Sequence, residues 1–288
     1  MLLGALEAGG TKMVCAVGNE NGEIINQMSI PTETPDITIP KIIDYFSAYE
    51  IKALGIGSFG PVDLNPSSDT YGFITSTPKL DWVNYNLVGA FKDALSIPIG
   101  FDTDVNCSAL GEATWGSTKG LGTSIYITVG TGVGVGIYQE GRLLHGMLHP
   151  EAGHILLTKH PEDTYKGKCP YHMNCLEGLA AGPAIKERWQ KEAFELTNEA
   201  KVWELEAYYL AQAIVNYILI LSPHRIVLGG GVMHQTQLFP LIREKVSSLL
   251  AGYVQTSELS DLEHYIVPAA LNDNQGIMGC LKLAHLAL

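Results

Sequence analysis

The chain has 288 residues, 46% hydrophobic and 17% charged, a balance typical of folded globular proteins. A formal net charge of −12 argues against a nucleic-acid partner, whose backbone it would repel, but not against a nucleotide held at a local site. No apolar run is long enough to cross a bilayer, so we expect no membrane partner. The N-terminus has no basic region of the signal-peptide kind, so we expect a cytoplasmic protein. The odd count of five cysteines argues against a disulfide framework.

The first part of the sequence predicts three strands followed by alternating helices and strands. Gly9-Gly10 separates the first two strands, and Asn21-Gly22 supplies the turn of the second hairpin. The expected elements are strands over 2–8, 12–17 and 23–30, a helix over 36–49, a strand over 52–60, a helix near 86–96, a strand over 97–102 and a helix from about 104.

The same pattern restarts after Gly116. The expected elements are strands over 124–130 and 133–139, a helix over 201–221, a strand over 225–231, a helix near 238–250, a strand over 264–269 and a helix from Asn274. Two successive units of this kind predict an α/β architecture with two similar domains and an interdomain cleft. We place the N-terminal domain at 1–118, completed by the C-terminal helix at about 272–288, and the C-terminal domain at 119–271.

Two glycine-rich turns, EAGGTK and TVGTGVGVG, open the two predicted domains. Glycines let backbone N–H groups approach an anion, and a threonine hydroxyl adds a donor. One such turn is explained equally well by an ordinary hairpin, but two suggest a phosphate chain held from both sides of a cleft. Neither a P-loop nor a dinucleotide-binding fingerprint is present. The candidate nucleotide-binding residues are Gly9, Gly10, Thr11 and Lys12 in the first turn and Gly130, Thr131 and Gly132 in the second.

A third glycine segment, IVLGGGVM, is a buried strand that runs into three glycines. Backbone without side chains can lie flat against a planar base, although a tight strand-to-helix turn is the simpler explanation. AAGPAI opens a helix and could supply the opposite wall. The candidates here are Gly229, Gly230, Gly231 and Met233, together with Ala181 and Pro183.

Acidic residues mark a second candidate site. Asp102 and Asp104 lie where a strand gives way to a helix, and Asp104 fits either helix capping or acceptance of a proton from a bound hydroxyl. Glu151 and Glu177 fit either a solvated surface or hydrogen bonds to a polyhydroxy substrate.

Residues 154–175 contain a cluster of soft metal ligands: His154, Cys169, His172 and Cys175. Two sulfur and two nitrogen donors suit tetrahedral zinc, and a filled set of four indicates a structural ion with no open position for catalysis. The spacing is not that of a zinc finger. We expect the ion to hold the loop that bears Glu151 and Glu177.

These motifs together resemble bacterial sugar kinases of the ROK family, most closely their zinc-containing fructokinase branch. EAGGTK and TVGTGVGVG are similar to the two phosphate motifs of the actin-like (ribonuclease H-like) ATPase superfamily, and IVLGGGVM to its adenosine motif. HPEAGH followed by CPYHMNCLEGLAAGPAI is similar to the zinc-bearing signature, while SFGPVDL and TPKLDW resemble the fructokinase branch. The resemblance covers residues 4 to about 284.

The resemblance implies an ATP-dependent hexose kinase that converts D-fructose to D-fructose 6-phosphate. It implies Asp104 as general base, structural Zn²⁺, Mg²⁺ accompanying ATP, and a homodimer. The implied sugar-binding residues are Gly60, Pro61, Thr103, Asp104, Glu151, His154 and Glu177.

Two positions depart from the family pattern. Glu7 stands where many superfamily members have Asp, and Thr103 stands where glucokinases of the family have Asn. The first phosphate motif begins too near the first residue for the helix-turn-helix of ROK repressors. The alternatives are a mannokinase or glucokinase of broader specificity and a sugar-sensing regulator without turnover. A zinc hydrolase would need the open coordination position that the full ligand set denies.

Overall fold

The computed structural model describes all 288 residues, which divide into two compact units. Unit 1 contains Met1–Gly120, Arg142–Pro150 and Ala270–Leu288, and unit 2 contains Leu121–Gly141 and Glu151–Ala269. None of the helices combines the length and hydropathy that crossing a bilayer requires.

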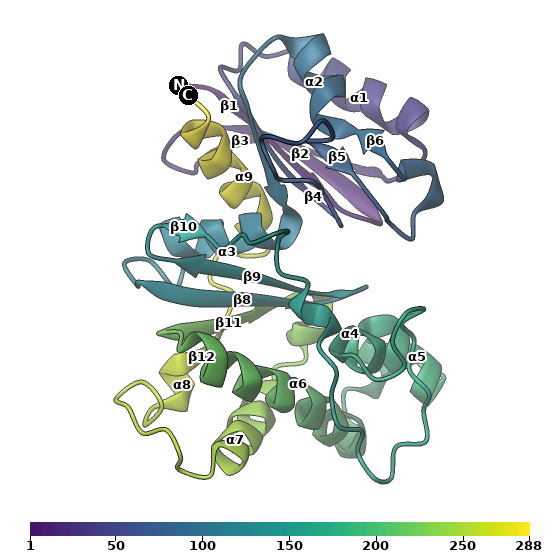
Figure 1. The fold of residues 1–288 in the computed structure, drawn as a ribbon, viewed down its shortest axis with the longest axis vertical. Helices are drawn as coiled ribbons and strands as arrows, with labels where there is room; N and C mark the ends of the chain where they lie inside the picture. The colour runs from purple at the N-terminus through teal and green to yellow at the C-terminus, as the bar shows by residue number, and fades with distance from the viewer. The chain divides into compact units, whose positions relative to one another are not determined.

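A five-stranded sheet forms the centre of unit 1 (Figure 1). Its order is β3 (Ile24–Pro31), β2 (Lys12–Gly18), β1 (Leu3–Ala8), β4 (Leu54–Ser58) and β7 (Ile99–Thr103). β1, β2 and β3 pair antiparallel, whereas β4 and β7 join in parallel. Successive side chains of a strand point to opposite faces, so the largely apolar β1 supplies apolar residues to both faces of the sheet.

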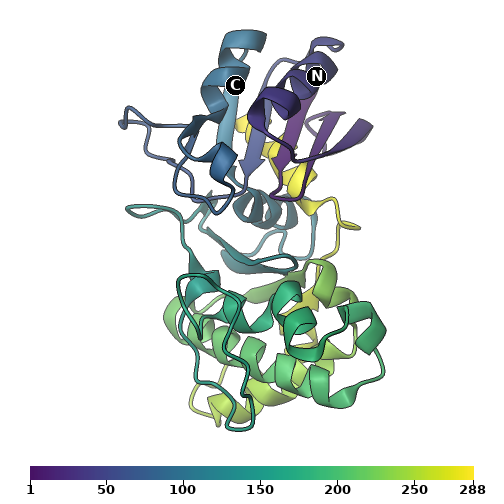
Figure 2. The same cartoon turned by 90° about the vertical axis from the view of Figure 1, so that its right-hand side faces the viewer.

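Helices cover both faces of this sheet. One core cluster contains Phe46 and Phe91, and a second contains Ile277 and Leu281 of the C-terminal helix. That helix, α9, packs on β1 and β4 and is drawn in yellow beside the purple strands in Figure 2. The elements around the sheet are α1 (Pro35–Ser47), β5 (Phe73–Ile74), η1 (Leu80–Trp82), β6 (Tyr85–Asn86), α2 (Leu87–Leu95), α3 (Asp104–Trp115) and α9 (Gln275–Leu286).

The second sheet repeats the arrangement of the first. Its order is β10 (Arg142–Leu143), β9 (Val133–Gln139), β8 (Thr123–Val129), β11 (Arg225–Gly229) and β12 (Ile266–Pro268). β8 and β9 form an antiparallel hairpin, and β11 and β12 add in parallel. The other elements are η2 (Ala152–His154), α4 (Leu176–Ala180), α5 (Gly182–Trp189), η3 (Ala193–Leu196), α6 (Ala200–Leu221), η4 (Gly231–His234), α7 (Leu238–Leu250) and α8 (Leu262–Tyr265).

The α/β fold expected from the sequence is confirmed, because every predicted strand and helix has a counterpart in the structure. Several boundaries differ by one or two residues, and at the last strand the predicted start is wrong: His264 and Tyr265 belong to α8, and the strand begins at Ile266. Asp261 accepts a hydrogen bond from the His264 N–H and thereby starts a helical turn.

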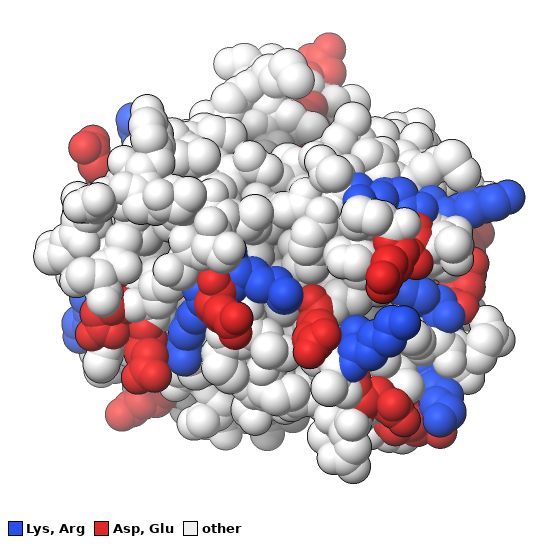
Figure 3. All heavy atoms as spheres, turned by 90° about the horizontal axis from the view of Figure 1, so that it is seen from below, with Lys and Arg blue, Asp and Glu red and all other residues white.

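The charged side chains are interspersed on the face seen in Figure 3. Acidic and basic residues alternate there and are separated by wide areas without formal charge. That face therefore has no basic patch of the kind that binds a polyanion.

Candidate functional site

Three glycine-rich segments meet in unit 2. The turn between β8 and β9 is closed by a 2.9 Å hydrogen bond from the Gly130 N–H to the Gly132 carbonyl. The Gly182 N–H, at the start of α5, donates to the Gly130 carbonyl at 2.8 Å. A Cβ added at Gly130 would lie 3.9 Å from the Gly231 nitrogen. The segments predicted to hold a nucleotide are thus neighbours, and the backbone of Gly231 is exposed with open space where a side chain would stand.

The strand-to-helix turn after β11 depends on glycine. Gly230 has φ +89°, and a Cβ there would lie 2.5 Å from the Val129 carbonyl oxygen. Ala181 and Met233 are buried, whereas Pro183 is partly exposed. This region can therefore present backbone and the Pro183 ring to a ligand, while the side chains of Ala181 and Met233 are withdrawn into the protein.

The first glycine turn lies in unit 1, between β1 and β2. Thr32 holds it from the side, because its hydroxyl donates to the Gly9 carbonyl at 2.7 Å and its N–H donates to the Thr11 carbonyl at 3.0 Å. Thr11 and Lys12 are exposed. A threonine hydroxyl and an ammonium group are thus available to an anion at this turn.

Two carboxylates, Glu7 at the end of β1 and Asp104 at the start of α3, form the acidic centre of unit 1. Loss of water around its carboxylate raises the pKa of Asp104 to about 6, although the backbone N–H groups of Val105 and Asp104 itself lower it. Burial, and then the charge of Asp104, raises the pKa of Glu7 to about 7, with Lys12 acting in the opposite direction. Asp104 keeps part of its surface exposed. It can therefore accept a proton near neutral pH.

Asp102, at 2% exposure, organises the strand end before Asp104. Its Oδ1 accepts hydrogen bonds from the Thr103 N–H at 2.8 Å and from Asn106 Nδ2 at 2.7 Å. Thr103 caps α3, because its hydroxyl accepts from the Asn106 N–H at 3.1 Å. The side chain of Thr103 is therefore committed to the helix start and is 4% exposed.

Two histidines attach residues 142–150 to the rest of unit 1. His145 Nε2 lies 2.8 Å from Asp102 Oδ2, and this hydrogen bond raises the pKa of His145. Burial lowers the pKa of His149, whose Nε2 accepts the Val62 N–H at 3.2 Å. The same ring lies beside Gly60, a predicted sugar-binding residue, at 3.3 Å from an added Cβ. The two environments thus act in opposite directions, favouring the cationic form of His145 and the neutral form of His149.

The four sulfur and nitrogen ligands predicted from the sequence come together in unit 2. The ligand atoms of His154, Cys169, His172 and Cys175 all lie within 4.8 Å of one another. Cys169 Sγ is 3.7 Å from Nδ1 of both histidines, and Cys175 Sγ is 3.7 Å from His154 Nδ1. The cluster could therefore hold a metal ion.

Glu177 connects this cluster to the second glycine turn. Its Oε1 faces His154 Nε2 at 3.8 Å, and its Oε2 accepts the Val133 N–H at 3.0 Å. A Cβ at Gly132 would lie 2.6 Å from Glu177 Oε2, so any larger residue there would displace the Glu177 carboxylate. Glu151 is exposed at the start of η2, where its carbonyl accepts the His154 N–H at 2.9 Å.

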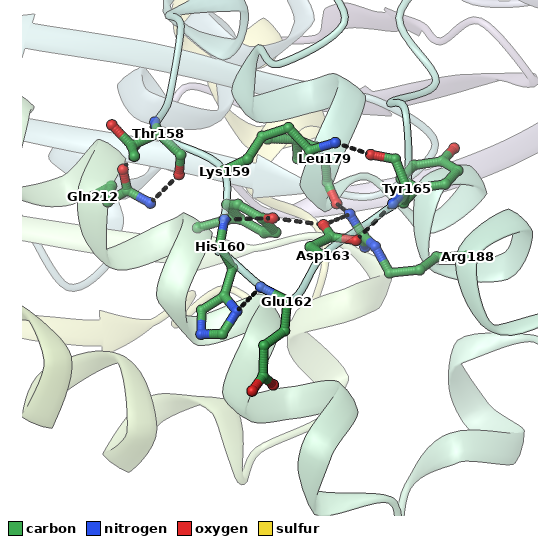
Figure 4. A network of polar contacts seen from close by, with 10 residues as sticks. Thr158, Lys159, His160, Glu162, Asp163, Tyr165, Leu179, Arg188 and Gln212 are labelled. Carbon is green, nitrogen blue, oxygen red and sulfur yellow. Dashed lines mark hydrogen bonds and ion pairs between the residues drawn. The ribbon is translucent and has the colours of Figure 1, made fainter.

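A polar network with a buried Asp163–Arg188 pair at its centre fixes the loop between His154 and Cys169 (Figure 4). The Asp163 carboxylate lies 3.2 Å from Arg188 Nη2 and accepts the Tyr209 hydroxyl at 2.5 Å. Arg188 Nη2 also donates to the Leu179 carbonyl at 2.9 Å. The side chain of Gln212 bonds the backbone of Thr158 in both directions, at 3.1 and 3.0 Å. Arg188 thus joins the metal-ligand loop to α4, the helix that contains Glu177.

The structure groups the sequence-predicted residues by unit. Unit 1 holds Gly9, Gly10, Thr11, Lys12, Gly60, Pro61, Thr103 and Asp104, and unit 2 holds Gly130, Thr131, Gly132, Glu151, His154, Cys169, His172, Cys175, Glu177, Ala181, Pro183, Gly229, Gly230, Gly231 and Met233. Sequence reasoning missed the pairing of His145 with Asp102, because no spacing rule relates residues 43 positions apart. The only sequence signal near this pair was the Asp102-Thr103-Asp104 pattern, which places two acidic residues at the end of one strand.

Comparisons of the sequence and of the fold with known proteins identify relatives among sugar kinases. A model of the ROK family matches residues 3–287. The chain is 56% identical over 288 residues to a Bacillus subtilis (strain 168) protein to which a fructokinase role is ascribed, covering 100% of this chain and 96% of that protein. It is 48% identical to the "Fructokinase" of Pediococcus pentosaceus, covering 100% and 99%. A ROK family glucokinase from Streptomyces griseus, solved with glucose and AMPPNP, has the same fold at TM-score 0.78 and 23% identity, covering 99% of this chain and 100% of that one.

Proposed function

The chain belongs to the ROK family, and on that premise we propose that it transfers the γ-phosphoryl group of ATP to the 6-hydroxyl of D-fructose. The observation that supports this most strongly is 48% identity, over essentially the whole of both chains, to a protein named fructokinase. The local chemistry is consistent with this proposal, because unit 1 combines an anion-binding turn with a carboxylate suited to proton acceptance.

In this proposal Asp104 is the general base. It removes the proton from the sugar 6-hydroxyl, and a pKa of about 6 leaves it ionised and moderately basic at neutral pH. The sugar-binding role extends to Gly60, Pro61, Thr103, Glu151, His154 and Glu177. Since the Thr103 hydroxyl caps α3, we assign its contribution to the shape of the site and to the orientation of Asp104.

Phosphates and adenosine are assigned to the glycine-rich segments. Gly9 to Lys12 would hold phosphate oxygens in unit 1, as would Gly130 to Gly132 in unit 2. The backbone of residues 229–231, with Pro183, would contact the nucleoside. Mg²⁺ enters with ATP and supplies charge neutralisation of the phosphate chain.

We also propose that the cysteine–histidine cluster holds a structural zinc ion. Zinc bonds of about 2.3 Å to sulfur and about 2.0 Å to nitrogen place a sulfur and a nitrogen ligand ~3.5 Å apart in a tetrahedron, close to the observed 3.7 Å separations. Cys169, Cys175, His154 and His172 would supply the four ligands. Glu177 faces the second ring nitrogen of His154, as outer carboxylates often do around ligating histidines.

Two further assignments belong to this proposal. A homodimer follows from the family resemblance, and a cytoplasmic location follows from the use of ATP as phosphoryl donor. The main competing substrates are mannose and glucose, the alternatives that the family resemblance leaves open.

A hexose panel tests the proposed function directly. Purified protein is incubated with ATP, Mg²⁺ and fructose, mannose or glucose, and ADP release is measured together with the position of the new phosphate. We expect fructose 6-phosphate as the main product. Sugar binding without ADP release for any hexose would instead identify a sugar-sensing regulator.

A further inference from the structure

We infer that Lys79 binds the phosphoryl group in transfer, at the first glycine turn. This inference rests on the proposed kinase function and adds a residue to it. Gly10 of that turn faces the Lys79 side chain, since a Cβ built on Gly10 has Lys79 Cε as its single neighbour, at 3.4 Å. The absence of a side chain at Gly10 thus leaves the ammonium group of Lys79 beside the backbone of the turn.

The Lys79 ammonium has no competing partner in the structure. It forms no ion pair and no hydrogen bond, whereas Lys41, Lys168 and Lys186 each pair with a glutamate. Its side chain is only partly exposed, so the charge is neither neutralised by protein nor fully surrounded by water. In a protein of net charge −12, an unpaired cation beside an anion-binding turn favours a phosphate ligand.

The backbone of Lys79 is held in place by a buried tryptophan. The Lys79 carbonyl accepts the Trp82 N–H at 2.9 Å, and the Lys79 N–H donates to the Thr77 hydroxyl at 3.3 Å. Trp82 is 1% exposed, donates its indole N–H to the Glu33 carbonyl at 2.9 Å and packs edge-on against Phe59. The backbone from which the Lys79 side chain extends is therefore fixed, which limits the reorganisation needed to meet developing charge.

The chemical step defines what Lys79 stabilises. The bond from the sugar O6 to Pγ forms, the bond from Pγ to the β,γ-bridging oxygen breaks with its electron pair left on ADP, and the O6 proton passes to Asp104. Negative charge spreads over the oxygens of the transferring group, which carries no compensating proton. An ammonium at Lys79 offsets this charge beside the first glycine turn.

The test compares Lys79→Met and Lys79→Arg with Lys92→Met, an exposed lysine on α2. We expect Lys79→Met to lower kcat with ATP and fructose by ~10²-fold, a usual cost of losing one transition-state donor, while Lys79→Arg recovers part of the loss. The Lys92→Met variant should keep the full rate. Binding of ADP, which lacks the transferred group, should be unchanged in Lys79→Met, whereas AMPPNP should bind more weakly.

The outcomes separate this inference from the proposed function. A wild-type protein that phosphorylates no hexose removes the kinase assignment and the role of Lys79 with it. An active wild type whose Lys79→Met variant keeps its kcat and its affinity for AMPPNP overturns the role of Lys79 alone. Loss of ADP and AMPPNP binding to the same extent, with no recovery in Lys79→Arg, would also overturn it, because that result indicates a structural effect.

Discussion

The imidazole of His145 donates to the carboxylate of Asp102 at 2.8 Å, and this pair joins residues 142–150 to the strand that leads into Asp104. Asp102 is almost completely buried, whereas the His145 side chain is 39% exposed. Around the pair lie Tyr71, Asp104, Cys107 and His149, all in unit 1. Of these, only Asp104 brings a second negative charge at neutral pH.

Stability should depend on pH through His145. The Asp102 partner raises its pKa in the folded state, so the stabilisation is fully present below the unfolded value of about 6.5 and is lost as the pH rises through the folded value. We expect His145→Gln, which keeps a donor but cannot titrate, to remove this pH dependence from the melting temperature. Since His145 is more than a third exposed, the effect should stay below about 1 kcal/mol.

The control for this experiment is His264→Gln. His264 also pairs with an aspartate at 2.8 Å, but both side chains are exposed and water screens them. A melting curve of His145→Gln that follows wild type at every pH would show that the pair adds no stability.

Asp104→Asn should abolish most of the activity. The amide keeps the shape of the side chain but cannot accept the sugar proton, so we expect kcat to fall by at least ~10²-fold. In the wild type, kcat/KM should decline as the pH falls through about 6, because protonated Asp104 cannot accept the sugar proton. Asp93→Asn, on an exposed face of α2, is the matched control. Near-normal turnover by Asp104→Asn would reduce Asp104 to a helix-start residue.

Metal content can be measured directly. Purified protein should contain about one zinc per chain, and Cys169→Ser or His172→Ala should lose the ion together with thermal stability and activity. Met173→Ala, which removes an exposed side chain from the same loop, should retain metal. A fully active preparation without zinc would rule out the structural-zinc proposal.

The buried Arg188–Asp163 pair should matter far more than an exposed pair on the same helix. Arg188→Met leaves Asp163 charged and buried, so we expect the free energy of unfolding to fall by about 3–5 kcal/mol in urea denaturation. Lys186→Met breaks the exposed contact with Glu192 and should cost less than about 1 kcal/mol. Equal effects of the two substitutions would mean that water reaches the Arg188 network.

Sugar preference can be tested at Thr103. Fructose should exceed glucose in kcat/KM by roughly 10-fold, since one misplaced sugar hydroxyl costs about 1–3 kcal/mol. Thr103→Asn, which preserves a capping oxygen, should move the ratio toward glucose, whereas Thr103→Ser should leave it unchanged. Equal or better efficiency of the wild type with glucose would overturn the fructose assignment and leave the kinase mechanism in place.

The sequence by itself determined the strands, the glycine turns and the metal-ligand cluster, because each depends on residues that are close together in the chain. Alternating apolar residues specify strands, and glycines in the turns expose backbone donors, because both effects act over a few residues. The cysteine–histidine cluster was readable because four ligands that fall within 22 residues need only one loop to meet. The short strands β5, β6 and β10 had no such local signal.

Contacts between distant residues were decided only by the tertiary structure. The pKa of Glu7 depends on Asp104, 97 positions away, and on the exclusion of water around both. The placement of residues 142–150 in unit 1 depends on His145 and His149 finding Asp102 and Val62. Lys79 comes to lie beside Gly10 because Trp82 is buried in the core of unit 1. Such effects arise from burial and long-range packing, which no short sequence pattern encodes.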